Sequence, residues 1–399
     1  MKGATPPIMS CNAEAPSTPF HKFTCLPTNL PVVLAPRRTP AVTAPKGNPA
    51  EGLAVFTSVG FQPVSPVDYS KYANHLKPDV VVALGDISYG PLPGRKRASK
   101  MAERTGMWVE SILSNLEKEP HGNTKAAVFA PILPTEVGGQ SYYFQHLEEL
   151  APRCTGLAIY DSAMLPALSK FPNMERLARL SLDEACGPHE ILNQVEMGMD
   201  IFCLPFLTTA TESGLALTFK FPVLPETEQD EPIEGTSVRS LAVNLADSAV
   251  ATAVEPLSKG CKCYTCTSHH RAYITHLLSA HEMLAWTLLQ VHNHAVMADF
   301  FTGIRHSIAG GTFAQDKAIF EKTYESEIGA GGAQKPRLRG YHAKSEGGDR
   351  KRNPPAWGAL GNDNEVPETI QSPAIPDESA DELDKKGFAE NLEDKPEKL

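Results

Sequence analysis

The sequence lacks any uninterrupted apolar run of the roughly 18 residues that a membrane-spanning helix needs. Its first residues also lack the basic segment followed by an apolar segment that forms a secretory signal. These two absences predict a soluble, intracellular protein without a transmembrane segment. Positive charge is not in excess, because 37 Lys and Arg against 47 Asp and Glu give a net charge of −10. This balance argues against a general nucleic-acid coat and leaves local RNA contacts open.

The size and composition are those of a globular protein. With 399 residues, 41% of them hydrophobic and 21% charged, the chain can bury a substantial core. A disulfide-stabilised miniprotein and a wholly disordered chain are therefore excluded. One large barrel or two smaller domains would fit this length.

Short apolar runs alternate with helical patterns through the middle of the chain, which indicates a parallel α/β sheet. The periodicity alone does not separate a closed barrel from an open doubly wound sheet. The predicted strands are Leu53–Val59, Asp79–Leu84, Ala126–Leu133, Gly156–Tyr160, Leu177–Leu182 and Asp200–Phe206, followed by Leu215–Phe219 and Ser240–Leu245. The predicted helices are Arg95–Leu116, Gly139–Leu150, Ser162–Lys170 and Pro188–Met197.

The flanking segments have a different composition. Residues 1–52 are rich in Pro and Ala and are predicted to be irregular, with one short strand at Val32–Leu34. Residues 326–399 form a predicted disordered tail, in which a basic stretch, Lys335–Arg352, precedes an acidic end. The basic stretch is either solvated or in contact with RNA phosphates.

Three of the eight cysteines, Cys261, Cys263 and Cys266, fall within six positions. Thiolates spaced this closely suit tetrahedral Zn²⁺ better than a set of disulfides. A fourth ligand is required, and several histidines follow in the sequence. The candidates are His269, His270, His276, His281, His292 and His294.

A predicted helix break selects among these histidines. Ser279 and Glu282 match a capping box, which predicts one helix from Thr267 to Ser279 and a second helix after it. If the two are antiparallel, arms of about 18 Å bring His292 back to the level of the cysteines. Three thiolates and one imidazole close a tetrahedron, so the predicted zinc is structural. The stripe predicted to be buried in this hairpin is Ile274, Leu277, Leu278, Leu284, Leu288, Val291 and Ala295.

Two segments resemble one known family, the tRNA-guanine transglycosylases, also called queuine tRNA-ribosyltransferases. The first is Cys261-x-Cys263-x2-Cys266-x25-His292 with its surroundings, and the second is the run from Pro188 to Phe202. The resemblance covers about residues 53 to 310. It implies a TIM-type (β/α)8-like barrel over residues 53–325, with a zinc-binding helical subdomain at 258–310 that holds one structural Zn²⁺. The family's amino-terminal strands have no evident counterpart before Leu53.

The resemblance also shows where this chain departs from catalytic members. Their nucleophilic Asp follows the Gly-x-Asp-x-Phe run, and that position holds Cys203 here. The arginine of their following Pro-Thr-Arg falls on Thr209. Asp200 is three positions before Cys203 and would point to the opposite face of a strand. Asp86 sits roughly where the family keeps a base-recognising Asp, although a loop or helix-cap role fits it as well.

These departures imply a non-catalytic subunit of the family. By resemblance it would pair with a catalytic subunit in a heterodimer that exchanges guanine for queuine at the wobble position of tRNAs with GUN anticodons. Family analogy places such a subunit in the cytoplasm, with peripheral association with the mitochondrial outer membrane. Two alternatives are an active transglycosylase with a non-standard nucleophile and a zinc-stabilised RNA-binding module.

Overall fold

A computed structural model describes residues 6–37, 42, 47–57, 60–87, 93–118, 126–223 and 238–333. The chain divides into two compact units, Met1–Gly348 and Asp349–Leu399, and every described residue belongs to the first. The predicted insertion Pro222–Gly235 and the predicted tail 326–399 therefore lie mostly outside the described residues.

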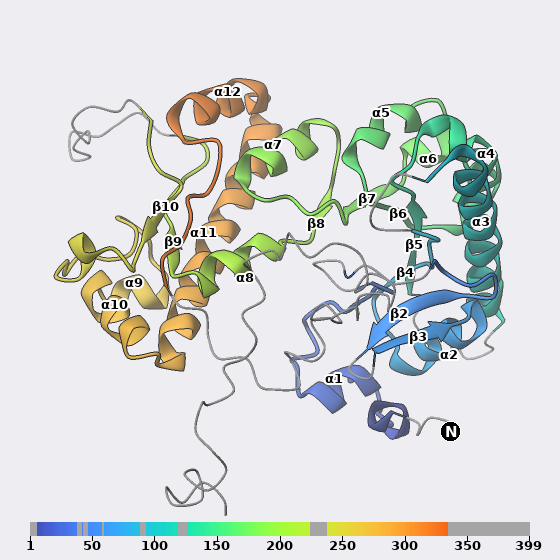
Figure 1. The fold of residues 1–399 in the computed structure, drawn as a ribbon, viewed down its shortest axis with the longest axis horizontal. Coiled ribbons are helices and arrows are strands. Elements are labelled where there is room, and N and C mark those ends of the chain that lie inside the picture. Colours follow the sequence, from blue (N-terminus) through green and yellow to red (C-terminus); the bar gives the residue numbers. More distant parts are fainter. Residues whose placement is uncertain are drawn as a thin grey trace, which may run out of the picture. The chain divides into compact units, whose positions relative to one another are not determined.

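Helices and strands follow one another through the first unit (Figure 1). The strands are β1 (Val33–Leu34), β2 (Leu53–Thr57), β3 (Gly60–Val64), β4 (Val80–Val82), β5 (Ala127–Ile132), β6 (Gly156–Ile159), β7 (Ala178–Ser181), β8 (Ile201–Phe202), β9 (Leu215–Leu217) and β10 (Ala242–Asn244). The α-helices are α1 (Pro19–Thr24), α2 (Pro66–Leu76), α3 (Arg95–Glu117), α4 (Ser141–Leu150), α5 (Leu165–Leu168), α6 (Pro172–Glu175), α7 (Pro188–Glu196), α8 (Pro205–Glu212), α9 (Tyr264–Ser268), α10 (Arg271–Ser279), α11 (Met283–Gly310) and α12 (Phe313–Thr323). The 3-10 helices are η1 (Pro7–Ser10), η2 (Val137–Gln140), η3 (Ala151–Arg153), η4 (Ser162–Met164) and η5 (Ser248–Val250).

A curled parallel sheet is the centre of this fold. Its described strands lie in the order β1-β4-β5-β6-β7-β8, and each neighbouring pair is parallel. Helices connect successive strands from β4 onward, as parallel pairing requires. The α/β prediction with a parallel sheet is therefore confirmed. Among the described strands, however, β9 pairs antiparallel with β10 instead of adding to this sheet.

Two strand predictions need correction. Leu53–Val59 was predicted for the parallel sheet, but β2 pairs antiparallel with β3, where Gly60 has a φ of 99° at the turn. Glycine adopts this left-handed backbone without a steric penalty, so a local hairpin forms instead. The strand predicted over Asp200–Phe206 ends at Phe202, because Pro205 begins α8, and proline suits the first turn of a helix.

The short strand predicted at Val32–Leu34 is β1, which pairs with β4 through Val33 and Val80. The sheet thus includes residues on the amino-terminal side of the predicted barrel boundary at residue 53. The remaining predicted strands and the four predicted helical regions correspond to elements of the structure, although their ends are shifted. The helix predicted at Ser162–Lys170 is divided into two short helices, η4 and then α5.

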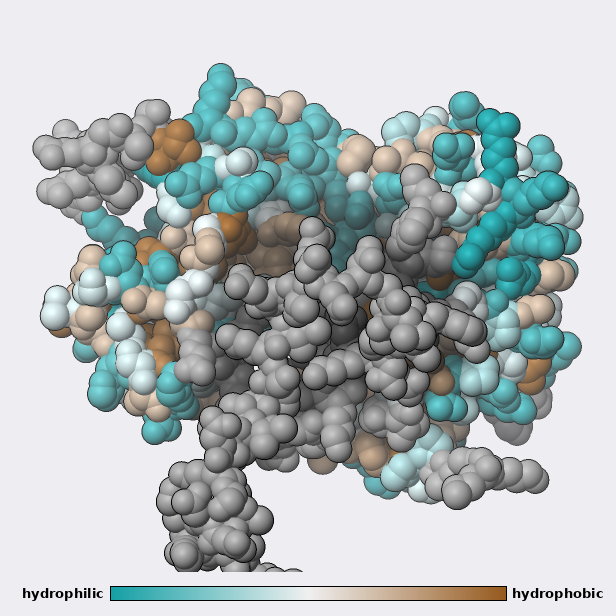
Figure 2. Space-filling view, in the orientation of Figure 1, coloured by the Kyte–Doolittle hydropathy of each residue, from teal (hydrophilic) through white to brown (hydrophobic). Residues whose placement is uncertain are grey.

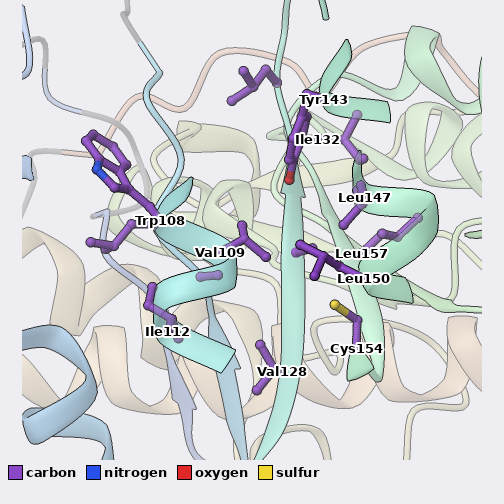
Figure 3. Packing of buried hydrophobic residues seen from close by; sticks show 14 of the residues in the cluster. Trp108, Val109, Ile112, Val128, Ile132, Tyr143, Leu147, Leu150, Cys154 and Leu157 are labelled. Carbon is purple, nitrogen blue, oxygen red and sulfur yellow. The ribbon is translucent and has the colours of Figure 1, made fainter. Parts of the chain in front are cut away.

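The main hydrophobic core lies between the sheet and its helices. Val109 of α3 and Leu147 of α4 are completely buried and belong to the same core cluster as Val128 and Ile132 of β5. Figure 3 shows side chains of α3 and α4 converging on Val128 and Ile132 of this strand. Burial of one such side chain contributes about 1.5–3 kcal/mol, so this core stabilises the packing of α3 and α4 against the sheet.

A second part of the first unit packs around α11. The cluster formed by β9, α8, α11 and α12 includes Phe219, Phe300 and Phe320, whose rings meet edge to face or tilted. A third cluster joins α10 to the first half of α11. The long helix α11 therefore takes part in two cores.

The solvent side of the sheet layer is polar. Figure 2 shows mainly hydrophilic residues where Figure 1 places α3 and α4. Within the described ranges, no helix combines the length and the hydropathy needed to cross a membrane.

Candidate functional site

Four predicted ligands meet in the helical subdomain. One donor atom from each of Cys261, Cys263, Cys266 and His292 lies within 4.8 Å of the others. His292 Nδ1 is 3.7, 3.6 and 3.3 Å from the Sγ atoms of Cys261, Cys263 and Cys266, respectively. The other histidines that were weighed from the sequence are not part of this group of donors.

The cysteine loop is ordered by its own backbone. Cys263 is the N-cap of α9, and its Sγ accepts a hydrogen bond from the backbone N–H of Cys266 at 3.4 Å. The backbone N–H of Cys261 donates to the carbonyl of Ser258. Thr265, between Cys263 and Cys266 in the sequence, is fully buried and donates from its hydroxyl to the Leu288 carbonyl at 2.6 Å. This contact ties the short helix α9 to α11.

The predicted helix break exists, but its chemistry differs from the prediction. Ser279 is the last residue of α10, and its hydroxyl donates to the Thr275 carbonyl instead of capping the next helix. Glu282 is the N-cap of α11 without a side-chain hydrogen bond, and His281 has a φ of 55° between the helices. The predicted capping box is therefore wrong. The predicted first arm is also divided, since α9 ends at Ser268 and α10 begins at Arg271.

His292 is oriented by a carbonyl of the neighbouring sheet. Its Nε2 is 2.8 Å from the carbonyl oxygen of Leu217 in β9. A carbonyl can only accept, so Nε2 carries the proton and donates, and the lone pair of Nδ1 faces the three sulfur atoms. A hydrogen bond from the other ring nitrogen to a carbonyl fixes the tautomer and orientation of a metal-ligating histidine.

Asn293, the residue after His292, is not among the site residues predicted from the sequence, yet its side chain fastens α11 to β9. Asn293 is fully buried, and its Oδ1 accepts from the backbone N–H of Leu217 at 2.9 Å. Its Nδ2 donates to Thr211 Oγ1 at 2.9 Å and to the Leu215 carbonyl at 3.0 Å. The motif Val-His-Asn around the proposed ligand was the available signal. Consecutive residues of α11 therefore bind the cysteine loop and strand β9.

Burial favours the neutral forms of Cys261, Cys266 and His292. It raises the pKa of Cys266 to about 12 and also raises the pKa of Cys261, in each case as the largest cause. Burial lowers the pKa of His292, opposed by its hydrogen bond to the Leu217 carbonyl. A neutral imidazole is ready to bind a metal, whereas the thiols must lose protons when one binds.

The donor set fits zinc. Tetrahedral coordination with typical Zn–S and Zn–N lengths places sulfur and nitrogen about 3.6 Å apart. The distances from His292 Nδ1 to the three sulfur atoms lie on either side of this value. Thiolate and imidazole ligands are also the donors of structural zinc sites. The arrangement could therefore hold a metal ion that joins the loop to α11.

The buried stripe of the hairpin differs in part from the prediction. Ile274, Leu278 and Leu288 are buried as predicted, with Leu277 beside them. Leu284 and Val291 are 46% and 41% exposed, so their predicted burial is wrong. The buried face of α11 instead contains Ala285, Trp286, Leu288, Leu289 and His292. Leu284 and Val291 are two turns apart and share the opposite, solvent-facing side.

Cys203 lies directly after β8, at the carboxyl edge of the parallel sheet. It packs against a small apolar cluster formed by Val82, Phe129, Ala158 and Leu180. Burial raises its pKa, and the carboxylate of Glu184 raises it further. The thiol therefore stays protonated at neutral pH and is a poor nucleophile.

Asp200 and Asp86, the two candidate aspartates of the sequence analysis, both contact other residues of the chain. Asp200 precedes β8, and its Oδ2 accepts from the backbone N–H of Arg179 at 2.8 Å, so it lies at the opposite end of the strand from Cys203. Asp86 is buried, with Oδ2 3.1 Å from Arg104 Nη2 and Oδ1 accepting from Asn48 Nδ2 at 2.7 Å. The structure does not bring Asp86 into the metal group, and base recognition by this residue stays a prediction.

Comparisons with known proteins agree with these features. The family described as "Queuine tRNA-ribosyltransferase" matches residues 15–326. The chain is 34% identical over 340 residues to the queuine tRNA-ribosyltransferase accessory subunit 2 of Schizosaccharomyces pombe, covering 85% of this chain and 74% of that relative. It is 29% identical over 281 residues to the human protein of the same name, covering 62% of this chain and 67% of that relative.

A third relative, from Drosophila mojavensis and with the same name, is 28% identical over 284 residues, covering 66% of this chain and 64% of the relative. The chain thus spans roughly two thirds to three quarters of the length of these curated relatives. The family match includes the cysteine loop, His292 and the Cys203 strand. The chain therefore belongs to the queuine tRNA-ribosyltransferase family, and it is similar to the accessory subunits of that family.

Proposed function

We propose that this chain is the non-catalytic subunit of a heterodimeric queuine tRNA-ribosyltransferase. In this role it pairs with a catalytic subunit that exchanges guanine for queuine at the wobble position of tRNAs with GUN anticodons. Family membership and the names of the similar relatives support the assignment. The single observation that carries the non-catalytic part is Cys203 at the nucleophile position.

The chemistry of Cys203 supports an inactive site. Base exchange through a covalent intermediate needs a nucleophile that is ionised or activated by a neighbouring base. The Cys203 thiol has a raised pKa, and the nearby carboxylate of Glu184 raises that pKa instead of lowering it. Asp200 cannot replace it, because it is held at the other end of β8 by the Arg179 backbone.

The metal in this proposal is one structural Zn²⁺ per subunit, held by Cys261, Cys263, Cys266 and His292. Bound there, the ion supplies a cross-link and no catalysis, since four protein donors leave no position for water. The chain's own contacts then extend that cross-link to the sheet, through the Leu217 carbonyl and the Asn293 amide.

We propose that the hairpin presents its exposed apolar residues to the catalytic subunit. Leu284 and Val291 share the solvent face of α11, and Met283 beside them is 63% exposed. Exposed apolar side chains grouped on a rigid helix are typical of protein interfaces. The RNA would be held by the part of the chain that contains the parallel sheet and by the basic stretch Lys335–Arg352. This stretch lies outside the described residues.

The proposal also includes the closed barrel fold of the family and the location of the protein in the cell. The family fold would be a TIM-type (β/α)8-like barrel, of which the described residues supply the parallel sheet β1 and β4–β8. We also propose a cytoplasmic protein with peripheral association with the mitochondrial outer membrane. Fractionation of cells that express the full chain tests the location, with recovery in another compartment as the contrary result.

Base exchange with labelled guanine on a GUN-anticodon tRNA tests the function. The assay compares this chain alone, the catalytic subunit alone, and the two co-purified. Exchange that occurs only with both, or is greatly enhanced with both, is the expected result. Turnover by this chain alone would support an active transglycosylase instead, and tRNA binding without any effect on exchange would support a separate RNA-binding module.

Cys203→Ala provides a sharper test of the inactive site. Because a protonated thiol in an apolar cluster contributes packing and no chemistry, the variant paired with the catalytic subunit should retain base exchange to within about twofold. Denaturing gels of the pair with tRNA should show the same covalent adduct as the unmodified pair, on the catalytic chain only. A loss of exchange of about a hundredfold or more would assign a catalytic role to Cys203.

A further inference from the structure

A mostly apolar cavity of about 390 Å³ lies beside α8. Helix α8 supplies one wall, the loop before α7 supplies a second, and the segment after α12 supplies a third. The apolar side chains that line it include Ala185, Phe206, Ala210, Leu215 and Ile328. The four metal donors are not part of this lining, so the cavity is separate from the proposed zinc site.

The segment after α12, Ile328–Ala333, is held against the end of α8. The backbone N–H of Ala333 donates to the Ser213 carbonyl at 3.2 Å. Gly331 lies so close to Ser213 that a Cβ on Gly331 would collide with the same carbonyl oxygen, so only glycine fits there. The chain is thereby directed past the cavity, and Ala333, where the description of this part of the chain ends, lies next to it.

Negative charge gathers on the side of the cavity that Cys186 lines. Partial burial raises the pKa of the Cys186 thiol, and nearby carboxylates raise it further. These carboxylates belong to Glu190, Glu184, Asp183 and Glu327. Glu190 is also tied to this loop, because its Oε2 accepts from the backbone N–H of Cys186 at 2.7 Å. An apolar cavity beside several carboxylates suits an apolar side chain that is flanked by positive charges.

The chain itself contains such a segment directly after the cavity. Residues Lys335–Tyr341 read Lys-Pro-Arg-Leu-Arg-Gly-Tyr, with Leu338 between two arginines. This segment begins two positions after Ala333 and belongs to the same compact unit, although it lies outside the described residues. Gly331, which lines the cavity, is within about 7 Å of Ala333, and five extended residues span up to about 17 Å. Leu338 is therefore close enough along the chain to reach the cavity.

We propose that Leu338 of the chain's own basic segment Lys335–Tyr341 occupies this cavity, with Arg337 and Arg339 beside its carboxylates. Burial of the leucine and attraction between opposite charges both favour this contact. The two arginines also belong to the stretch that is proposed to hold RNA, and in this respect the inference rests on the proposed function. A docked segment is withheld from RNA, so the cavity and the RNA compete for it.

Hydrogen exchange of the full-length, zinc-loaded chain, read by mass spectrometry, tests the contact. Leu338→Asp places a charge where an apolar group is needed, and Leu360→Asp makes the same change further along the sequence as its control. Thr209→Trp fills the cavity from an exposed position of α8. Thr208→Trp is its control, because Thr208 is exposed on the same helix and does not line the cavity. The two test variants change the two sides of the contact separately, so the test does not depend on the folding of either one.

The backbone amides of residues 335–341 should exchange at least about fivefold more slowly in the unmodified chain than in Leu338→Asp or Thr209→Trp. Leu360→Asp and Thr208→Trp should leave this exchange unchanged. Higher salt should speed exchange in the unmodified chain, because it screens the attraction between the arginines and the carboxylates. Thr209→Trp frees the segment without changing its charge, so an anticodon stem-loop RNA should bind this variant up to about fivefold more tightly in fluorescence anisotropy.

Docking is overturned if residues 335–341 of the unmodified chain exchange as fast as a free peptide, or if Thr209→Trp and Thr208→Trp exchange equally. Protection that grows with protein concentration also overturns it and assigns the cavity to the segment of a second copy. If protection behaves as expected while RNA binding by Thr209→Trp is unchanged, competition with RNA is overturned and docking stands. Base exchange by the co-purified pair is measured separately, and its failure with normal protection would contradict the proposed function and leave docking intact.

Discussion

At the scale of single residues, His292 connects two parts of the chain. Its Nδ1 faces three sulfur atoms, and its Nε2 donates to the carbonyl of Leu217, 75 positions earlier. The ring is fully buried, so no water can replace either contact. One imidazole therefore couples the metal group to strand β9, and substitution of this residue removes both interactions together.

His292→Ala should lower zinc affinity by at least about a hundredfold, because it removes a ligand and opens a coordination position. Competition with a chromogenic chelator measures the affinity. His294→Ala is the matched control, since His294 is exposed on the same helix and bonds only to Gln290 in the described structure. Equal zinc retention by the two variants would contradict the ligand assignment.

The pH dependence of metal binding follows from the thiols. Because burial raises the pKa of Cys261 and of Cys266, both thiols are protonated at neutral pH. Each must lose its proton when a metal ion binds. Zinc affinity should therefore fall as pH falls, by about a hundredfold per pH unit for two displaced protons. The lowered pKa of His292 keeps its imidazole neutral over most of the range from pH 8 to pH 6.5. Affinity that does not change between pH 8 and pH 6.5 would contradict this account.

At the scale of elements, the attachment of α11 to β9 holds the helical hairpin against the two-stranded sheet of β9 and β10. Asn293 satisfies a donor and an acceptor of the β9 backbone as well as the Thr211 hydroxyl. Helix α11 then continues for a total of 28 residues into the aromatic cluster with α12. The hairpin and the aromatic cluster therefore share one long helix.

Asn293→Leu should destabilise the folded chain by about 2–4 kcal/mol, since it leaves several buried polar groups of β9 and α8 without partners. Urea unfolding, followed by far-ultraviolet circular dichroism, measures the change. Within the described residues the side chain of Gln290, one turn earlier, hydrogen-bonds only to His294, so Gln290→Leu should cost less than about 0.5 kcal/mol. Similar losses for both variants would show that the amide network does not hold the hairpin.

Sequence reasoning identified this hairpin but not its details. Closely spaced cysteines and two helical arms of similar length were sufficient to select His292 from several histidines. Ser279 could not be placed correctly, because a serine can cap the next helix or bond back to its own, and tertiary contacts decide between them. Leu284 and Val291 were misplaced for a related reason, since α11 is apolar on more than one side and only packing shows which side is buried.

The parallel sheet could likewise be predicted from alternating strands and helices, whereas closure of a barrel could not. Strand pairing between distant segments depends on backbone hydrogen bonds that leave little trace in side-chain patterns. The strand at Leu53 illustrates this limit, because Gly60 directs it into a local hairpin with β3. The role of Asn293 was also hidden, since the residues that it contacts lie far earlier in the sequence.

At the scale of the whole molecule, the proposed function of this chain is to bind the catalytic subunit and the tRNA. Its net charge of −10 argues against RNA binding over the entire surface, so the proposed contacts with RNA would be local. The exposed apolar residues of α11 and the basic stretch Lys335–Arg352, which is proposed to hold RNA, are separate segments of the sequence. One surface can therefore be altered without changing the other, and the two kinds of association can be tested independently.

Leu284→Asp combined with Val291→Asp should reduce co-purification with the catalytic subunit by at least about tenfold, because buried charges oppose an apolar interface. Zinc content should be unchanged, since neither side chain faces the metal group. Met107→Asp is the control, because Met107 is 52% exposed on α3. Normal pairing of the double variant would remove this face from the proposed interface.

The hydrogen bond between His292 and Leu217 has a consequence for the synthesis of the chain. During translation the three cysteines emerge before His292, and Leu217 emerges before all of them. Until α11 has been made, the cysteine loop can bind a metal only with incomplete and mobile coordination. Complete coordination arises only after α11 has been made and strand β9 is in place. If the proposed zinc binds there, metal uptake would serve as a measure of assembly, because a fully coordinated ion would mark a chain whose helical hairpin has docked on β9.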